Sequence, residues 1–371
     1  MAAIEVTDLR KTFTVKHKAA GLGGSLRALW RPRLDAVEAV RGLSFRMEEG
    51  ELLGFIGPNG AGKSTTIKML TGILHPTSGQ ARVLGFVPWK ERRQLAYHIG
   101  TVFGQRSQLW MHLPAVDTFQ LFGRIYELDP AETRRRIAML AEAFEIEHLL
   151  ETPVRKLSLG QRMRCEVAAS LLHRPRLILL DEPSIGLDPV AKQRIRDMIK
   201  RMNAEEGVGV LLTSHDAGDI EALCKRVIIV NHGQIVYEDR LSALKRRYLT
   251  EKDVSVRFIE PVTGEVAIPG TELVKAGGGG YGLKLKVDTA RTNIAEVLER
   301  IGRLGEVEDI TISDPALEEI IRTIYEQAAG PGLAESGAAA GAAVSIAADE
   351  GAAAGGVSES PAAVDGDAPA D

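Results

Sequence analysis

The sequence lacks any apolar run of the length that a membrane-spanning helix requires. Its apolar stretches at residues 177–180, 208–212 and 227–230 are far shorter than the roughly 20 residues that such a helix needs. The first residues, Met1-Ala-Ala-Ile-Glu-Val6, show no basic region followed by an apolar segment, so we expect no signal peptide. These absences predict a chain that does not cross a membrane itself, so that any membrane-spanning partner is another polypeptide.

The chain also has few cysteines and a net charge of small magnitude. Cys165 and Cys224 have no cysteine or histidine nearby at metal-ligand spacing, so we expect two reduced, buried thiols in a cytosolic protein. The net charge is −4, but residues 328–371 hold seven acidic residues and no Lys or Arg, so the rest of the chain carries +3. This charge is too small to favour nucleic-acid binding, and we expect no nucleic-acid partner.

Short apolar segments and amphipathic segments alternate along residues 1–240, which we expect to form one domain. The uniformly apolar run 52–56 is typical of a strand buried on both faces of a parallel sheet. This alternation predicts an α/β fold with a mainly parallel sheet. Strands are predicted at 1–13, 43–47, 52–56, 176–180, 208–213 and 227–230, helices at 66–74, within 115–150, and at 162–172, 189–203 and 216–223, and an inserted loop with a short helix at 14–36.

The character of the sequence changes beyond residue 241. Strands at 254–259, 282–287 and 307–312 and helices at 292–304 and 316–327 predict a small α+β domain over about 245–327. Residues 328–371 are rich in Ala, Gly, Ser, Asp and Glu and have almost no large apolar side chains. Such a segment buries too little surface to offset its ordering entropy, so we expect a disordered tail.

A glycine-rich loop joins the predicted strand 52–56 to the helix that follows it. In that setting, the pattern G-x-x-x-x-G-K-S is typical of a phosphate-binding P-loop rather than a chance turn. Its glycines let backbone N–H groups point at phosphate oxygens, and the helix N-terminus adds its dipole. Lys63 reaches the phosphates and the Ser64 hydroxyl ligates Mg²⁺. The predicted nucleotide-binding residues here are Gly57, Pro58, Asn59, Gly60, Ala61, Gly62, Lys63, Ser64, Thr65 and Thr66.

Acidic residues and a histidine follow two later strands. Asp181 and Glu182 end the strand 176–180, and His215 follows the strand 208–213. The carboxyl ends of parallel strands meet where ligands bind, so we expect Asp181 to hold Mg²⁺ and Glu182 to act as the general base. We expect His215 to be catalytic through contact with the γ-phosphate. The alternatives are a solvated turn for the two acids and a structural role for His215.

The stretch Leu157-Ser158-Leu159-Gly160-Gln161 distinguishes this chain from other P-loop proteins. With the motifs above, it resembles the signature L-S-x-G-Q of ATP-binding-cassette (ABC) ATPases. Leu159 stands where that family usually has Gly, which leaves the contacts of Ser158 and Gly160 intact. A hydroxyl and a glycine at a helix start also form an anion site. The resemblance covers about residues 1–240.

The resemblance implies a RecA-like parallel sheet with an antiparallel β edge and a helical subdomain at about 106–165. It also implies that two copies pair head to tail, with each ATP held between the phosphate loop of one copy and Ser158, Gly160 and Gln161 of the other. By the same resemblance, Gln105 touches Mg²⁺, so that the implied metal ligands are Ser64, Gln105 and Asp181. Residues 184–188 match the loop that contacts the second copy. Phe13 matches the aromatic residue that stacks on adenine, although a core-facing ring is the alternative.

The family resemblance leaves several functional classes open. The interval between the phosphate loop and the signature has no sustained heptads, which argues against the chromosome-associated members of the family. A single cassette argues against the translation-type members, and Glu182 argues against a non-hydrolytic scaffold. We therefore expect the ATPase subunit of a transporter, bound to a separate permease at the cytoplasmic face of the membrane. The sequence of residues 72–79 and the presence of the 245–327 domain resemble those of exporter ATPases, including the ATPases of multidrug or viologen-type exporters. An importer ATPase is the alternative.

Overall fold

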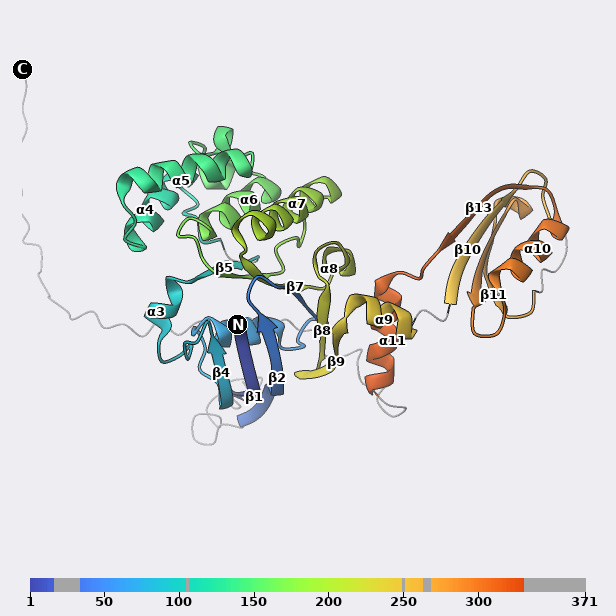
Figure 1. Ribbon diagram of the computed structural model, residues 1–371, viewed down its shortest axis with the longest axis horizontal. Coiled ribbons are helices and arrows are strands. Elements are labelled where there is room, and N and C mark those ends of the chain that lie inside the picture. The colour runs from blue at the N-terminus through green and yellow to red at the C-terminus, as the bar shows by residue number, and fades with distance from the viewer. Residues whose placement is uncertain (17–33, 105–106, 249–250, 263–267, 330–371) are drawn as a thin grey trace, which may run out of the picture. The chain divides into compact units, whose positions relative to one another are not determined.

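A six-stranded sheet organises the first 240 residues (Figure 1). The structure is a computed structural model that describes residues 1–16, 34–104, 107–248, 251–262 and 268–329. β3 lies inside the sheet, in parallel with β7 and β8, and β6 runs in parallel with β5 and β7. β9 forms an antiparallel edge on β8, which fits the edge that the family resemblance implied, although the sequence pattern did not predict this strand. The strands are, in spatial order, β5 (Ile99–Phe103), β6 (Leu177–Asp181), β7 (Gly209–Ser214), β3 (Leu52–Ile56), β8 (Arg226–Asn231) and β9 (Gln234–Arg240).

An antiparallel sheet of three strands accompanies the main sheet. Its order is β2 (Leu34–Glu48), β1 (Ala2–Lys16) and β4 (Ser78–Val83). β1 and β2 are longer than predicted and pair as far as Lys16 and Leu34. The insertion predicted at 14–36 is therefore too wide at both ends, because a continuous ladder extends the strands into it. The short helix predicted inside it lies outside the described residues.

The main sheet separates two apolar cores because successive side chains of a strand point to opposite faces. In β6, Leu177 and Leu179 join the core formed with the antiparallel sheet and α2 (Lys63–Leu70). Ile178 and Leu180 join the core on the other face. That second core contains residues of α4 (Ala115–Ile125), α5 (Pro130–Ala143), α6 (Leu159–Ser170), α7 (Pro189–Glu206), α8 (Ala217–Leu223) and α9 (Leu241–Tyr248). A further short helix, α3 (Arg92–Ala96), precedes β5.

The C-terminal segment forms a third core on a separate antiparallel sheet. The order of this sheet is β11 (Thr271–Gly277), β12 (Gly282–Asp288), β10 (Glu251–Phe258) and β13 (Val307–Ser313), and α10 (Ile294–Leu304) packs on it through Val297 and Ile301. The last helix, α11 (Leu317–Ala329), places Leu317, Ile320 and Ile324 in the core of the first 240 residues instead. The proposed 245–327 domain thus has its own core, to which α11 does not contribute. The tail predicted at 328–371 lies almost entirely outside the described residues.

Both cysteines are buried free thiols. Burial raises the pKa of the Cys165 thiol to about 12 and raises the pKa of Cys224 as well, which keeps both unreactive. In the described ranges, no helix is both long and apolar enough to span a bilayer.

His173 makes the stability of this fold sensitive to acid. Its ring stacks on Tyr126 with centroids 3.8 Å apart, and its Nε2–H donates to the Ile99 carbonyl at 3.0 Å. Burial lowers the pKa of His173 to about 4, while an unfolded histidine titrates near 6.5. The unfolded chain therefore binds more protons than the fold below about pH 6.5, and the free energy of unfolding falls until about pH 4.

We expect the substitution His173→Phe, which keeps a stacked ring, to reduce this loss. Urea unfolding at pH 7, 6 and 5 measures the slope, and the exposed His112→Phe serves as the control. If the free energy of unfolding of His173→Phe depends on pH as steeply as that of the wild type, His173 is not the source of the acid sensitivity.

Candidate active site

Three loops meet at the carboxyl edge of the main sheet. β3 ends at Ile56, which pairs with Ser214 at the end of β7. Asp181, at the end of β6, pairs with Thr213, which also lies on β7. The glycine-rich loop, the Asp181–Glu182 pair and the His215 loop therefore lie side by side, as the parallel order predicted.

The phosphate loop turns directly into α2. Gly62 precedes the helix with a φ of 98°, and a Cβ on it would lie 2.4 Å from the carbonyl oxygen of Ala39, so only glycine fits. The helix begins at Lys63 and ends at Leu70, so its predicted range of 66–74 was wrong at both ends. The earlier start places Ser64 and Thr65 in its first turn, where backbone N–H groups are free to bind an anion. Thr66 donates from Oγ1 to the Gly62 carbonyl at 2.9 Å.

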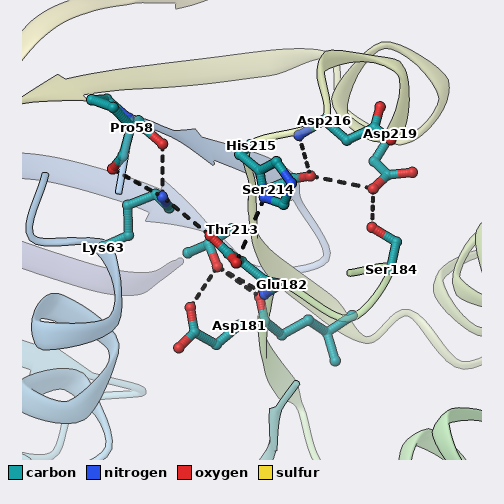
Figure 2. A network of polar contacts seen from close by, with 12 residues as sticks. Pro58, Lys63, Asp181, Glu182, Ser184, Thr213, Ser214, His215, Asp216 and Asp219 are labelled. Atoms are coloured by element: carbon teal, nitrogen blue, oxygen red, sulfur yellow. Dashed lines mark hydrogen bonds and ion pairs between the residues drawn. The ribbon is translucent and has the colours of Figure 1, made fainter. Parts of the chain in front are cut away.

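Lys63 is buried at the centre of this edge, with a 5% exposed side chain (Figure 2). Its Nζ donates to the Gly57 carbonyl at 2.7 Å and lies 3.2 Å from Oε1 of Glu182. A buried ammonium group requires such partners, because an unpaired charge in this position would be strongly destabilising. The phosphate-loop lysine and the predicted base are therefore in direct contact.

Glu182 occupies a strained backbone conformation. Its φ is 53°, in the left-handed region that residues other than glycine rarely adopt. The Glu182 backbone N–H donates to Oγ1 of Thr213 at 3.1 Å, which fixes this turn. Its carboxylate, 13% exposed, lies between Lys63 and His215, with Oε2 at 3.6 Å from Nδ1 of the half-exposed His215.

Two contributors to this site were not found from the sequence. Thr213 donates from Oγ1 to Oδ1 of Asp181 at 2.7 Å, and this bond orients the carboxylate. Gly104 packs so tightly that a Cβ would lie 2.4 Å from the Glu182 carbonyl oxygen. A threonine inside an apolar strand and a glycine beside a loop carry no distinctive sequence signal. Gln105, which follows Gly104, lies outside the described residues.

Two of the expected magnesium ligands lie in the described part of this edge, Ser64 in the first turn of α2 and Asp181 at the end of β6. Ser64 supplies a hydroxyl and Asp181 a carboxylate, which are ligand types that Mg²⁺ prefers. In the part of the chain that the structure describes, no three His, Cys, Asp or Glu side chains form a metal cluster. The donor set therefore fits an ion that is held jointly with nucleotide phosphates and water, as Mg²⁺ commonly is.

The signature residues form a separate helix start. Ser158 precedes α6 and accepts a hydrogen bond at Oγ from the Gln161 N–H at 3.2 Å, while Oε1 of Gln161 accepts from the Ser158 N–H at 2.9 Å. The helix begins at Leu159 rather than at the predicted 162 because this reciprocal cap nucleates it. Gly160 lies against Ala191 of α7, where a Cβ would be 3.0 Å from the alanine Cβ. Ser158 itself is exposed.

Phe13 lies on β1 in the antiparallel sheet, with an intermediate exposure. The Nζ of Lys11 lies 5.2 Å from the centre of its ring. The ring is thus not a fully buried core residue.

The sequence is similar to those of known proteins. The sequence pattern of the ABC transporter family matches residues 40–185. The ABC transporter ATP-binding protein NatA of Bacillus subtilis is 34% identical over 62% of this chain and 92% of its own length. The linearmycin resistance ATP-binding protein LnrL of the same species is 36% identical over 53% of this chain and 63% of that protein. The Nod factor export ATP-binding protein I of Ralstonia nicotianae is 31% identical over 82% and 86%, respectively.

Solved structures share the fold. The dimeric structure of MJ0796, a bacterial ABC transporter cassette, aligns with a TM-score of 0.54 and 25% identity, over 64% of this chain and 98% of that one. The matched pattern holds the phosphate loop, the signature and the Asp181–Glu182 pair. The chain therefore belongs to the ABC transporter family, as an ATP-binding protein with the ATPase domain of that family.

Proposed function

We propose that this protein hydrolyses ATP between two copies of its cassette to drive export through a separate membrane permease, with Glu182 as the general base. The observation that carries the catalytic part is the position of the Glu182 carboxylate, 3.2 Å from Lys63 and 3.6 Å from His215. A base must lie within hydrogen-bond reach of the water that it activates, next to the group under attack.

The proposed mechanism begins with the charge of Lys63. Phosphate oxygens compete with Glu182 for this ammonium group, since charge-assisted bonds to phosphate are strong in a buried site. The N–H groups at the start of α2 bind the same oxygens. Mg²⁺, held by Ser64 and Asp181, and by Gln105 as the family resemblance implies, would neutralise charge on the phosphates.

Glu182 is then free to accept a proton from the attacking water. His215, which approaches the carboxylate from β7, orients Glu182 and contacts the γ-phosphate. The left-handed backbone of Glu182 separates its direction from that of Asp181, so that the metal ligand and the base do not compete. Phe13, on the other sheet, is proposed to stack on adenine.

The second half of the proposed site comes from another copy. Ser158 is exposed at the start of α6, and an exposed helix start offers N–H groups to an anion. One chain therefore carries two anion sites of the same kind. The dimeric form of the MJ0796 cassette supports pairing of two such chains.

A fixed turn at residues 110–113 is the proposed permease contact. Its backbone is held by bonds from the Arg155 N–H to the Met111 carbonyl at 2.9 Å and from the Val154 N–H to the Leu113 carbonyl at 3.1 Å. Trp110 and Leu113 nevertheless remain 49% and 39% exposed. Exposed aromatic and apolar groups on a rigid turn are typical of contact sites.

Replacing Trp110 with glutamate is expected to abolish co-purification with the permease when both are expressed together, because an aromatic anchor becomes a charge. The ATPase rate of the isolated subunit should stay within about twofold, as for surface substitutions away from a site. Ile310→Glu, at an exposed apolar residue of β13, is the control. Retention of the permease by Trp110→Glu would remove this contact from the proposal.

Export is favoured over import by the relatives rather than by the geometry. Two of them carry export or resistance in their names. In inverted vesicles that contain the permease, export predicts ATP-driven uptake of substrate, whereas ATP-driven loss would indicate an importer.

A further inference from the structure

Asp219 is a buried carboxylate that the proposed mechanism does not use. It lies in the first turn of α8 and is 2% exposed. Its Oδ2 accepts hydrogen bonds from Oγ of Ser184 and, at 3.2 Å, from Oγ of Ser214 (Figure 2). Its Oδ1 accepts from Nε of Arg196 at 2.8 Å. One side chain thus joins the loop after β6, the end of β7 and helix α7.

The partners of Asp219 belong to the two loops that flank Glu182. Ser184 is 6% exposed, and the Ile185 N–H donates to the Glu182 carbonyl at 3.3 Å, so residues 182–185 form one turn. Ser214 directly precedes His215, and its Oγ also accepts from the Asp216 N–H at 2.9 Å. A displacement of either serine is therefore transmitted to Glu182 or to His215.

A second ion pair strengthens the same connection. Lys192, one turn before Arg196 on α7, pairs with Asp216, and Arg196 lies 4.0 Å from Asp216 as well as 2.6 Å from Asp219. Two cations of α7 thus hold the two acids that follow His215. Removing one partner of a buried pair leaves an uncompensated charge, so this set resists independent movement of the loops.

We propose that Asp219 is a positioning residue that couples the 184–188 loop to His215 and thereby sets the distance from His215 to Glu182. The inference rests on the proposed catalytic roles of these two residues. Because residues 184–188 are the segment expected to contact the second copy, Asp219 also makes the alignment of Glu182 and His215 depend on that contact.

The test compares ATP hydrolysis by the full-length Asp219→Asn, Ser184→Ala and His215→Ala variants. Asp219→Asn keeps the volume and loses the charge, and Ser184→Ala removes one hydroxyl with little risk to folding. We expect kcat to fall about tenfold or more, since a misplacement of about 1 Å is sufficient for that, while KM changes less than about twofold. Asp197→Asn removes an exposed carboxylate of α7 and is the matched control, with an unchanged rate.

The double variant Asp219→Asn/His215→Ala separates positioning from a general structural defect. If Asp219 acts through His215, the double variant is no slower than His215→Ala alone. Losses that multiply, a normal rate in both Asp219→Asn and Ser184→Ala, or a change confined to KM would overturn the inference. A normal rate in His215→Ala would instead refute the proposed catalytic role of His215 and with it the basis of the coupling.

Discussion

Replacing Glu182 with glutamine is expected to lower ATP turnover by about two to four orders of magnitude, the usual contribution of a general base. Glutamine keeps the size of the side chain and its place between Lys63 and His215, but it cannot take a proton from water. The loss should fall on kcat. ATP binding should persist, because the phosphate loop and the start of α2 are untouched and Lys63 no longer has an anionic side chain 3.2 Å away.

The same variant should accumulate as an ATP-bound dimer, because the closed state forms and is not consumed. Size-exclusion chromatography with ATP and Mg²⁺ measures this accumulation, and a filter assay with labelled ATP measures binding. Glu205→Gln, at an exposed residue that pairs with Arg201 on α7, is the control and should behave like the wild type. Hydrolysis at the normal rate by Glu182→Gln would exclude Glu182 as the base.

The parallel core and its site edge were predictable from the sequence because their signals are local. The uniformly apolar runs of β3, β6 and β7 identify buried strands, and each ends directly at a residue with distinctive chemistry. Parallel order then brings Lys63, Glu182 and His215 together without further information. The start of α6 was predicted three residues too late, at 162, because the reciprocal cap of Ser158 and Gln161 was not used.

Elements without a one-sided apolar pattern were missed. β11 has the sequence Thr-Glu-Leu-Val-Lys-Ala-Gly and is exposed along most of its length, so neither alternation nor an apolar run marks it. β9, an edge strand, ends in the exposed residues Glu-Asp-Arg and was missed for the same reason. Here pairing with a neighbouring strand decides the structure, and that pairing is not encoded within the segment.

Polar contacts between residues far apart in the sequence could not be predicted either. Asp219 and Ser184 are separated by 35 positions, and nothing in either segment predicts that they share a hydrogen bond. The left-handed backbone of Glu182 is likewise imposed by its surroundings, through Thr213, rather than by the residue itself. The sequence thus pointed to the groups that we propose to contact ATP, but not to the residues that hold them in place.

Mixing two inactive variants tests whether the site is shared between copies. Lys63→Ala disables the phosphate loop of its own chain. Ser158→Arg places a long cation at the exposed start of α6, at a cost of about 1 kcal/mol for the lost cap, which the fold should tolerate. Each variant alone should be inactive, although Ser158→Arg keeps every residue of the Lys63–Glu182–His215 cluster.

In a mixed dimer, the intact phosphate loop of the Ser158→Arg chain faces the intact signature of the Lys63→Ala chain. One site of two is therefore complete, and the other carries both defects. Random pairing of equal amounts makes half of the dimers mixed, so the mixture should recover up to about a quarter of the wild-type rate, with one trapped nucleotide per mixed dimer. A site contained within one chain predicts no recovery. Recovery beyond one site per dimer would also contradict sharing, because no pairing of these two chains completes both sites.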